Sequence, residues 1–203
     1  MTKIDREEAT RRILQLRGID LHKVAYEHNV TVRSANGKIN KGWAGHAIER
    51  HLGMPANSVQ EPDFGDWELK VIPVKKLKTG ALKVKETMAV TMINPDQVKA
   101  TPFESSHLLA KLRKFVLVAR VVGGHALEPS YVISAAAVDL TGQTYELVRA
   151  DYESIRETIA NSGFNALSGR MGRLVQPRTK GQAKSNTRAF YARTSFLGQL
   201  LSI

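Results

Sequence analysis

The sequence has no cysteine among its 203 residues, and this absence excludes several kinds of chemistry. Without a thiol there is no disulfide scaffold, no thiolate-bound zinc and no cysteine nucleophile. Long apolar runs are missing as well: none approaches the roughly 18 residues of a membrane span, and the charged N-terminus lacks the apolar part of a signal peptide. We therefore expect a cytoplasmic protein with no membrane contact.

Acidic residues are scarce. The chain has 19 Asp and Glu against 30 Lys and Arg, so its formal net charge is +11, and no acidic residue follows Glu157. Hydrophobic residues make up 42% of the chain, which is typical of a folded domain rather than a disordered basic tail. Such an excess of positive charge indicates a polyanionic partner, and nucleic acid is the obvious one.

Two common cofactor motifs are also missing. The six histidines are scattered, and His46 and His51 are five residues apart, so they do not share a helical face as zinc ligands would. The glycine-rich stretch 163–173 lacks the residue order of a phosphate-binding loop. The sequence therefore predicts neither a zinc site nor dependence on ATP.

Hydrophobic periodicity and end signals predict helices and strands in both halves of the chain. Asp5 with Glu8 is typical of a helix N-cap with a capping box, and Asp151 is expected to cap a later helix. The expected helices are 6–17, 20–28, 43–52, 105–114 and 151–161, and the β-rich runs are 67–74, 87–94, 115–122 and 131–138.

This order of elements predicts an α/β or α+β fold with a central mixed sheet flanked by helices. We expect one domain over residues 1–203. Within it we distinguish an N-terminal helical part over about 1–42, a core over about 43–160 and a basic C-terminal region over about 161–203.

The segment EPDFGDWELKVIP carries the sharpest chemical signal. Glu68 and Lys70 are two residues apart on a predicted strand, so their side chains leave the same face. If Asp63 joins them from the preceding turn, two carboxylates could hold Mg²⁺, and the lysine would lie beside the attacking water. The pattern is that of metal-assisted phosphodiester hydrolysis.

A simpler interpretation is that Glu68 and Lys70 form the solvent-exposed face of an amphipathic strand. The lysine-rich context favours the catalytic interpretation, because no acid interrupts the six lysines between residues 70 and 85, namely Lys70, Lys75, Lys76, Lys78, Lys83 and Lys85. A positive segment next to a carboxylate site suits a polyanion that approaches the site.

Five blocks resemble, in order, the family of the mismatch-repair nicking endonuclease MutH and the GATC-cutting type II restriction endonucleases grouped with it. They are NKGWAGHAIERHLG, EPDFGDWELKVIPV, TMAVTMIN, FESSHLLAKLRKFVLV and RAFYARTSFLGQLL. The resemblance runs from about Lys41 to the C-terminus. It implies a restriction-endonuclease-like fold with a PD-(D/E)xK active site.

The resemblance also implies roles for individual residues. Asp63 and Glu68 match the metal-binding carboxylates, Lys70 the catalytic lysine, and Glu49 and Lys111 further residues of the active site. Residues expected to contact DNA are Lys41, Arg178, Lys180, Lys184 and Tyr191, the last at the position of a tyrosine that senses adenine methylation. The spacing from Asp63 to Glu68 is two residues shorter than in the repair enzyme.

We therefore expect a Mg²⁺-dependent endonuclease that cuts duplex DNA at GATC or a related site, like a type II restriction enzyme. One alternative is a MutH-like repair enzyme that nicks one strand when a mismatch-repair partner activates it. A second is a DNA-binding protein without catalysis. Because one site cuts one strand, a double-strand break needs a homodimer or two successive nicks.

Overall fold

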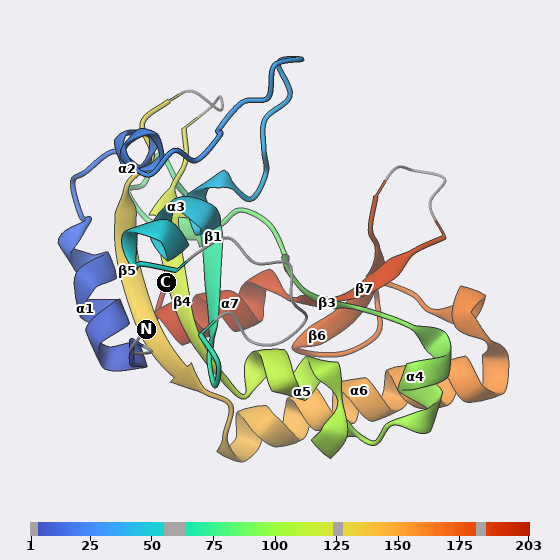
Figure 1. Cartoon of the computed structure of the whole chain (residues 1–203). Coiled ribbons are helices and arrows are strands. Elements are labelled where there is room, and N and C mark those ends of the chain that lie inside the picture. Colours follow the sequence, from blue (N-terminus) through green and yellow to red (C-terminus); the bar gives the residue numbers. More distant parts are fainter. Residues whose placement is uncertain (1–3, 55–63, 124–127, 182–185) are drawn as a thin grey trace. The chain divides into compact units, whose positions relative to one another are not determined.

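The computed structural model describes residues 4–54, 64–123, 128–181 and 186–203. Its contacts divide the chain into two compact units. The first comprises Met1–Lys85, Phe115–Val138 and Leu200–Ile203, and the second comprises Glu86–Lys114 and Asp139–Gln199. Each unit combines helices with a sheet of its own (Figure 1).

The first unit contains a four-stranded mixed sheet in the order β2-β1-β4-β5. Strand β1 is antiparallel to β2 and parallel to β4. The strands are β1 (Glu68–Lys76), β2 (Leu82–Val84), β4 (Lys114–Val121) and β5 (Val132–Asp139). Three helices precede the sheet in sequence, namely α1 (Arg6–Gln15), α2 (Leu21–Glu27) and α3 (Trp43–His51).

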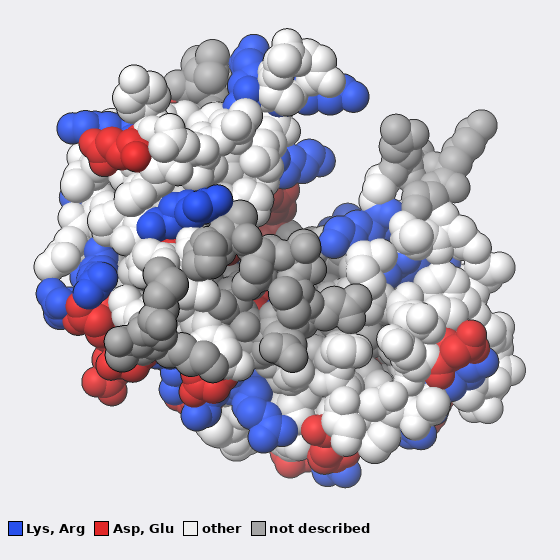
Figure 2. Space-filling view, in the orientation of Figure 1, with Lys and Arg blue, Asp and Glu red and all other residues white. Residues whose placement is uncertain are grey.

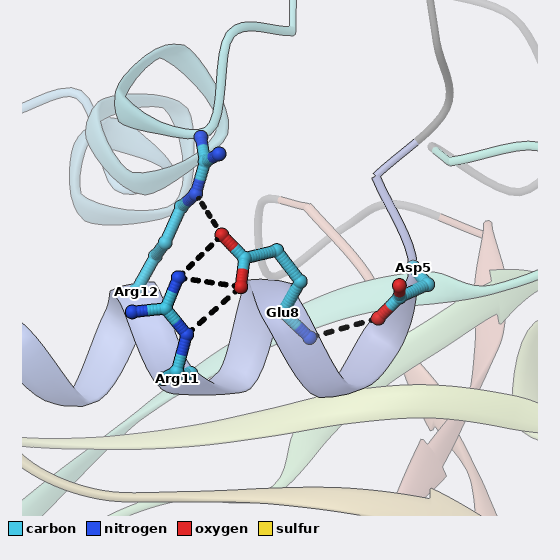
Figure 3. A network of polar contacts seen from close by, with 4 residues as sticks. All are labelled: Asp5, Glu8, Arg11 and Arg12. Atoms are coloured by element: carbon cyan, nitrogen blue, oxygen red, sulfur yellow. Dashed lines mark hydrogen bonds and ion pairs between the residues drawn. The ribbon is translucent and has the colours of Figure 1, made fainter.

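Helix α1 begins where the sequence predicts it. The Asp5 carboxylate accepts a hydrogen bond from the backbone N–H of Glu8 at 2.8 Å, which confirms the N-cap. The Glu8 side chain, however, binds Arg11 and Arg12 on the next turn, with its closest contact to each at 2.6 Å (Figure 3). These two guanidinium groups lower the pKa of Glu8 below its usual value.

The core of the first unit lies between these helices and one face of the sheet. Leu69 of β1 and Val116 of β4 are paired in register, so their side chains share this face. They pack in one buried cluster with Ile13 of α1, Leu21 of α2 and Ile48 of α3. Burial of such side chains contributes about 1.5–3 kcal/mol each, so this cluster holds β1 in place.

The second unit contains a three-stranded antiparallel sheet in the order β3-β7-β6. Its strands are β3 (Met88–Met92), β6 (Val175–Thr179) and β7 (Arg188–Ala192). The helices are α4 (Pro95–Ala100), α5 (His107–Leu112) and α6 (Gly142–Ser162), with short 3₁₀ turns at Phe103–Ser105 and Phe164–Ala166. Helix α7 (Thr194–Leu201) follows β7.

The α+β class with mixed strands and flanking helices is confirmed, but two details of the prediction are wrong. The run 87–94 does not join the central sheet, because its strand β3 pairs with β7 near the C-terminus. Asp151 does not cap a helix, because α6 begins nine residues earlier, at Gly142. Its carboxylate is buried and binds backbone N–H groups of another segment.

Within the described ranges, no helix is both long enough and apolar enough to span a membrane.

Candidate active site

Glu68 and Lys70 meet at the start of β1, as their spacing predicts. They are the first and third residues of the strand, and their side chains leave the same face. The Lys70 ammonium donates a hydrogen bond from Nζ to Oε1 of Glu68 at 2.6 Å, so the two groups form a close ion pair. The predicted convergence of a carboxylate and an ammonium is confirmed.

This ion pair is withdrawn from solvent. Glu68 is only 3% exposed, and the Lys70 side chain only 17%. In the parallel register Glu68 lies opposite Phe115 and Lys70 opposite Leu117, and both of these β4 residues are fully buried. The simpler interpretation, a solvent-exposed strand face, is therefore wrong for these two residues. A charged pair in apolar surroundings interacts more strongly than one in water.

The turn before β1 fixes where the strand begins. The Phe64 N–H donates to the carbonyl of Trp67 at 3.0 Å, and the two rings stack with centroids 3.9 Å apart. Both side chains are buried, and the Trp67 indole N–H donates to the carbonyl of Ile4 at 3.1 Å. These contacts anchor the backbone directly before Glu68. Asp63 lies outside the described residues, so its role in the site stays a prediction.

Two further predicted residues belong to the first unit. Glu49 is half-buried on α3, a helix that packs against β1, and its neighbour Ile48 is fully buried in the core. Lys41 is exposed, two residues before α3 begins. The helix therefore holds Glu49 in the same unit as the ion pair, while a role of either residue at the active site stays a prediction.

Part of the lysine-rich segment after the ion pair lies on the other face of the sheet. Lys75 of β1 lies opposite Lys83 of β2, and both are exposed. Because side chains alternate along a strand, Lys75 leaves the face of the sheet that carries Leu69, not the face of Lys70. These like-charged neighbours repel each other and do not extend the surface around the ion pair.

Lys111 belongs to the second unit. It lies in the last turn of α5, whose N-terminus is capped by the Ser106 hydroxyl, which accepts a hydrogen bond from the Leu109 N–H at 3.1 Å. Leu108, Leu109 and Leu112 are buried, and Lys111 itself is half-buried. The packing of these leucines fixes the helix, and the catalytic role of Lys111 stays a prediction.

Two of the residues expected to contact DNA share one face of the second sheet. Tyr191 of β7 is paired with Gln176 of β6, so it lies on the same side as Arg178. The Arg178 guanidinium is 6.0 Å from the centroid of the Tyr191 ring and donates to the Thr87 hydroxyl at 3.1 Å. The contact with Thr87 joins residues 91 positions apart, and no sequence signal indicates it.

The remaining predicted DNA contacts differ in what the structure describes. Lys180 is exposed directly after β6, with its backbone N–H donating to the carbonyl of Thr187 at 2.9 Å. Lys184 lies outside the described residues. Figure 2 shows lysine and arginine side chains distributed over the visible surface, in keeping with the net charge of +11.

The described part of the chain contains no group of three or more His, Asp or Glu side chains placed to hold a metal ion. The donor chemistry at Glu68 nevertheless fits a hard cation, because its carboxylate offers the oxygen ligands that Mg²⁺ prefers. The Lys70 ammonium holds one oxygen of this carboxylate, Oε1, through the 2.6 Å hydrogen bond.

Comparison with known proteins identifies relatives over nearly the whole chain. The family described as "DNA mismatch repair enzyme MutH" matches residues 52–125. The DNA mismatch repair protein MutH of Vibrio campbellii is 30% identical over 96% of this chain and 92% of its own length. That of Shewanella woodyi is 31% identical over 97% of this chain and 90% of its own.

Among solved structures, the "Restriction endonuclease MvaI-cognate DNA substrate complex" covers 89% of this chain and 93% of its own, with 14% sequence identity. The TM-score of this match is 0.36, a likeness too weak to support a functional conclusion. The matches to curated relatives define the class of this protein: it is an enzyme, a DNA endonuclease. The chain belongs to the MutH family. The match also includes the N-terminal helices, which the resemblance from Lys41 onward left out.

Proposed function

We propose that this protein is a Mg²⁺-dependent, sequence-specific endonuclease that hydrolyses phosphodiester bonds in duplex DNA at GATC or a related site. The observation that carries the proposal is the buried Glu68–Lys70 pair at 2.6 Å at the start of β1. This pair lies within residues 52–125, where the family match falls. A carboxylate and an ammonium that meet at this spacing fit the metal-assisted phosphodiester hydrolysis that the sequence motif predicts.

Asp63 and Glu68 would hold the metal ion. When bound there, Mg²⁺ would offset negative charge on the phosphoryl oxygens and favour ionisation of a bound water. In the hydrolysis the water oxygen bonds to phosphorus, one ester P–O bond breaks, and the proton released by the water ends on the leaving oxygen. The reaction needs no ATP and no redox partner.

Lys70 has two tasks in this proposal. Its ammonium holds the Glu68 carboxylate in one orientation through the 2.6 Å hydrogen bond, and its positive charge faces the negative charge that grows on the phosphoryl group. Because the pair is largely withdrawn from water, this charge stabilisation is worth more than it would be on an open surface. Glu49 and Lys111 would support the site.

Recognition of the bases is assigned to the second unit. Arg178 and Tyr191 share one face of its sheet, and Lys180 follows the same strand. Arginine can bind a guanine edge through two parallel hydrogen bonds, and lysines bind phosphates. We assign Lys41 and Lys184 to backbone contacts. The enzyme would work in the cytoplasm, where its DNA substrate is accessible.

A repair enzyme is the second candidate function. These curated relatives carry the printed name "DNA mismatch repair protein MutH" and match over 92% and 90% of their own length. In that role one site would nick one strand after activation by a repair partner, whereas double-strand cleavage would need a homodimer or two nicks. A third candidate, DNA binding without catalysis, leaves the buried acid–lysine pair without a task.

The proposal is tested with a labelled duplex that contains one GATC site, incubated with Mg²⁺. The wild type is expected to cut it, and Lys70→Ala is expected to bind it with similar affinity but not to cut. Lys23→Ala, which removes an exposed lysine from α2 of the same unit, serves as the matched control and should cut like the wild type. Cutting by Lys70→Ala at the wild-type rate would show that the site is elsewhere.

A further inference from the structure

A network of polar contacts, buried at Asp151, holds the strand that carries Arg178. Strand β6 is preceded by residues 164–174, which we call the connecting segment because it links α6 to β6. This segment contains no strand and only one short 3₁₀ turn, and a further turn bond runs from the Met171 N–H to the Ser168 carbonyl at 3.0 Å. Side chains from α6, from β7 and from Arg193 directly after it supply further hydrogen bonds to the segment.

Asp151, in the middle of α6, binds the N–H groups at the end of this segment. Its Oδ1 accepts from the Arg173 N–H at 2.7 Å, and its Oδ2 accepts from those of Leu174 and Val175 at 2.7 and 2.8 Å. The Asp151 side chain is buried, with 5% exposure. A carboxylate that accepts three backbone donors ties the first residue of β6 to the helix.

Arg193, which follows β7, binds the carbonyls of the same segment. Its guanidinium donates to Gly169 at 3.0 Å, to Met171 at 2.8 Å and to Gly172 at 3.0 Å, and its backbone N–H donates to Leu174 at 2.8 Å. A planar guanidinium presents several donors in a fixed arrangement, so it can hold three carbonyls at once.

The first residue of β7 acts on the other end of the segment. The Arg188 guanidinium donates to the carbonyls of Leu167 and Asn165 and lies 5.4 Å from the centre of the Phe164 ring. Arg188 and Arg193 add to the positive charge of the C-terminal region. The structure shows that both side chains are occupied by the protein's own backbone.

We propose that Asp151 and Arg193 are positioning residues for base selection. Together they fix where β6 begins relative to β7, and so the face on which Arg178 lies. If the pairing of β6 with β7 slipped by one residue, Arg178 would leave the face of the sheet that carries Tyr191. It would then lie on the opposite face, where Phe190 packs against Tyr152 of α6. This inference rests on the proposed function, in which β6 and β7 read the DNA.

The test compares Arg193→Lys and Asp151→Asn with the wild type. Arg193→Lys keeps the charge but cannot hold three carbonyls, and Asp151→Asn keeps the shape but loses one acceptor oxygen. The measurement is kcat/KM on the preferred duplex and on duplexes with one changed base pair. We expect both variants to lower the ratio of kcat/KM on the preferred duplex to kcat/KM on a changed duplex by about tenfold or more. A loss of this size is typical when a protein loses its contact with one base pair that it reads directly. Cleavage of the changed duplexes should persist.

Arg170→Lys is the matched control, because it makes the same substitution at an exposed arginine of the same segment. Its ratio should stay within about twofold of the wild type. Hydrogen exchange of the amides of residues 173–175 gives a second readout that needs no cleavage, and we expect it to be faster in both positioning variants.

Outcomes that would overturn the inference are distinct from those against the proposed function. If the wild type cuts with Mg²⁺ but Arg193→Lys and Asp151→Asn keep the wild-type ratio, the inference is wrong while the function stands. Unchanged exchange at residues 173–175 would also overturn it. A wild type that cuts no duplex would instead count against the proposed function. Hydrogen exchange at residues 173–175 would then still test whether Asp151 and Arg193 hold the start of β6.

Discussion

Replacement of Asp151 by alanine should destabilise the protein more than most single substitutions do. The wild-type carboxylate is 5% exposed and accepts three backbone hydrogen bonds of 2.7, 2.7 and 2.8 Å. Asp151→Ala leaves three donors without this acceptor; the N–H groups of Leu174 and Val175 are buried, and each such unpaired group costs about 1–3 kcal/mol, while that of Arg173 is part-buried and costs less. Relief of the carboxylate's own burial offsets part of this sum. We expect a net loss of about 3–5 kcal/mol.

Urea denaturation followed by circular dichroism measures this loss as a shift of the unfolding midpoint at constant slope. Glu157→Ala, an exposed position on the same helix α6, is the control and should change the stability by less than about 0.5 kcal/mol. A loss below about 1 kcal/mol for Asp151→Ala would refute the reasoning, because the three hydrogen bonds would then carry little of the energy that holds the connecting segment.

Two further predictions concern Tyr152 and Gly172. Burial raises the pKa of Tyr152 from 10.0 to about 12, so above pH 10 the unfolded chain releases a proton that the folded protein retains. The wild type should therefore lose about 1.4 kcal/mol of stability per pH unit from pH 10 to 12 relative to Tyr152→Phe, and parallel pH curves of the two proteins would contradict this. Gly172 has φ +73°, and an added Cβ would lie 1.8 Å from the Val175 carbonyl oxygen. Gly172→Ala should thus lower the melting temperature by several degrees, whereas an unchanged value would contradict the close approach.

The ion pair could be predicted from the sequence because its geometry is local. Two residues at i and i+2 on any strand leave the same face, whatever the strand pairs with. The sequence could not show how deeply Glu68 is buried, since this depends on Phe115 and Leu117 of a strand more than 40 positions away. For the same reason a solvent-exposed face was a reasonable alternative.

The second sheet could not be predicted because its pairing is non-local. Its C-terminal strands are five residues each. Strand β6, VQPRT, contains Pro177 and three polar residues, and β7, RAFYA, has apolar residues at successive positions, so neither has the alternation that marks a strand. The start of α6 was missed because Thr141 makes no side-chain cap bond and Gly142 is a poor helix former. Asp151 has the residue type of an N-cap, but its partners lie 22 to 24 positions further on.

The roles of Glu49, Lys111 and the DNA contacts could not be derived from residue patterns alone. A half-buried glutamate or lysine on a helix is typical of a surface position, and only the family resemblance gives these two a function. The structure adds the constraint that Arg188 and Arg193, although basic, bind backbone carbonyls. Positive charge along the sequence is therefore not equivalent to positive charge available to DNA.

The most direct test of a metal-dependent endonuclease is the fate of supercoiled plasmid. Adenine-methylated and unmethylated plasmid should each be incubated with purified protein and either Mg²⁺ or EDTA. We predict cleavage only with Mg²⁺, with defined linear fragments from a restriction-type enzyme or open circles from a nicking repair enzyme, and the resistant plasmid would reveal the response to methylation. Plasmid that is cut equally in EDTA would contradict a metal-dependent endonuclease, and plasmid that stays intact under every condition would contradict the proposed restriction-type enzyme, which needs no activating partner.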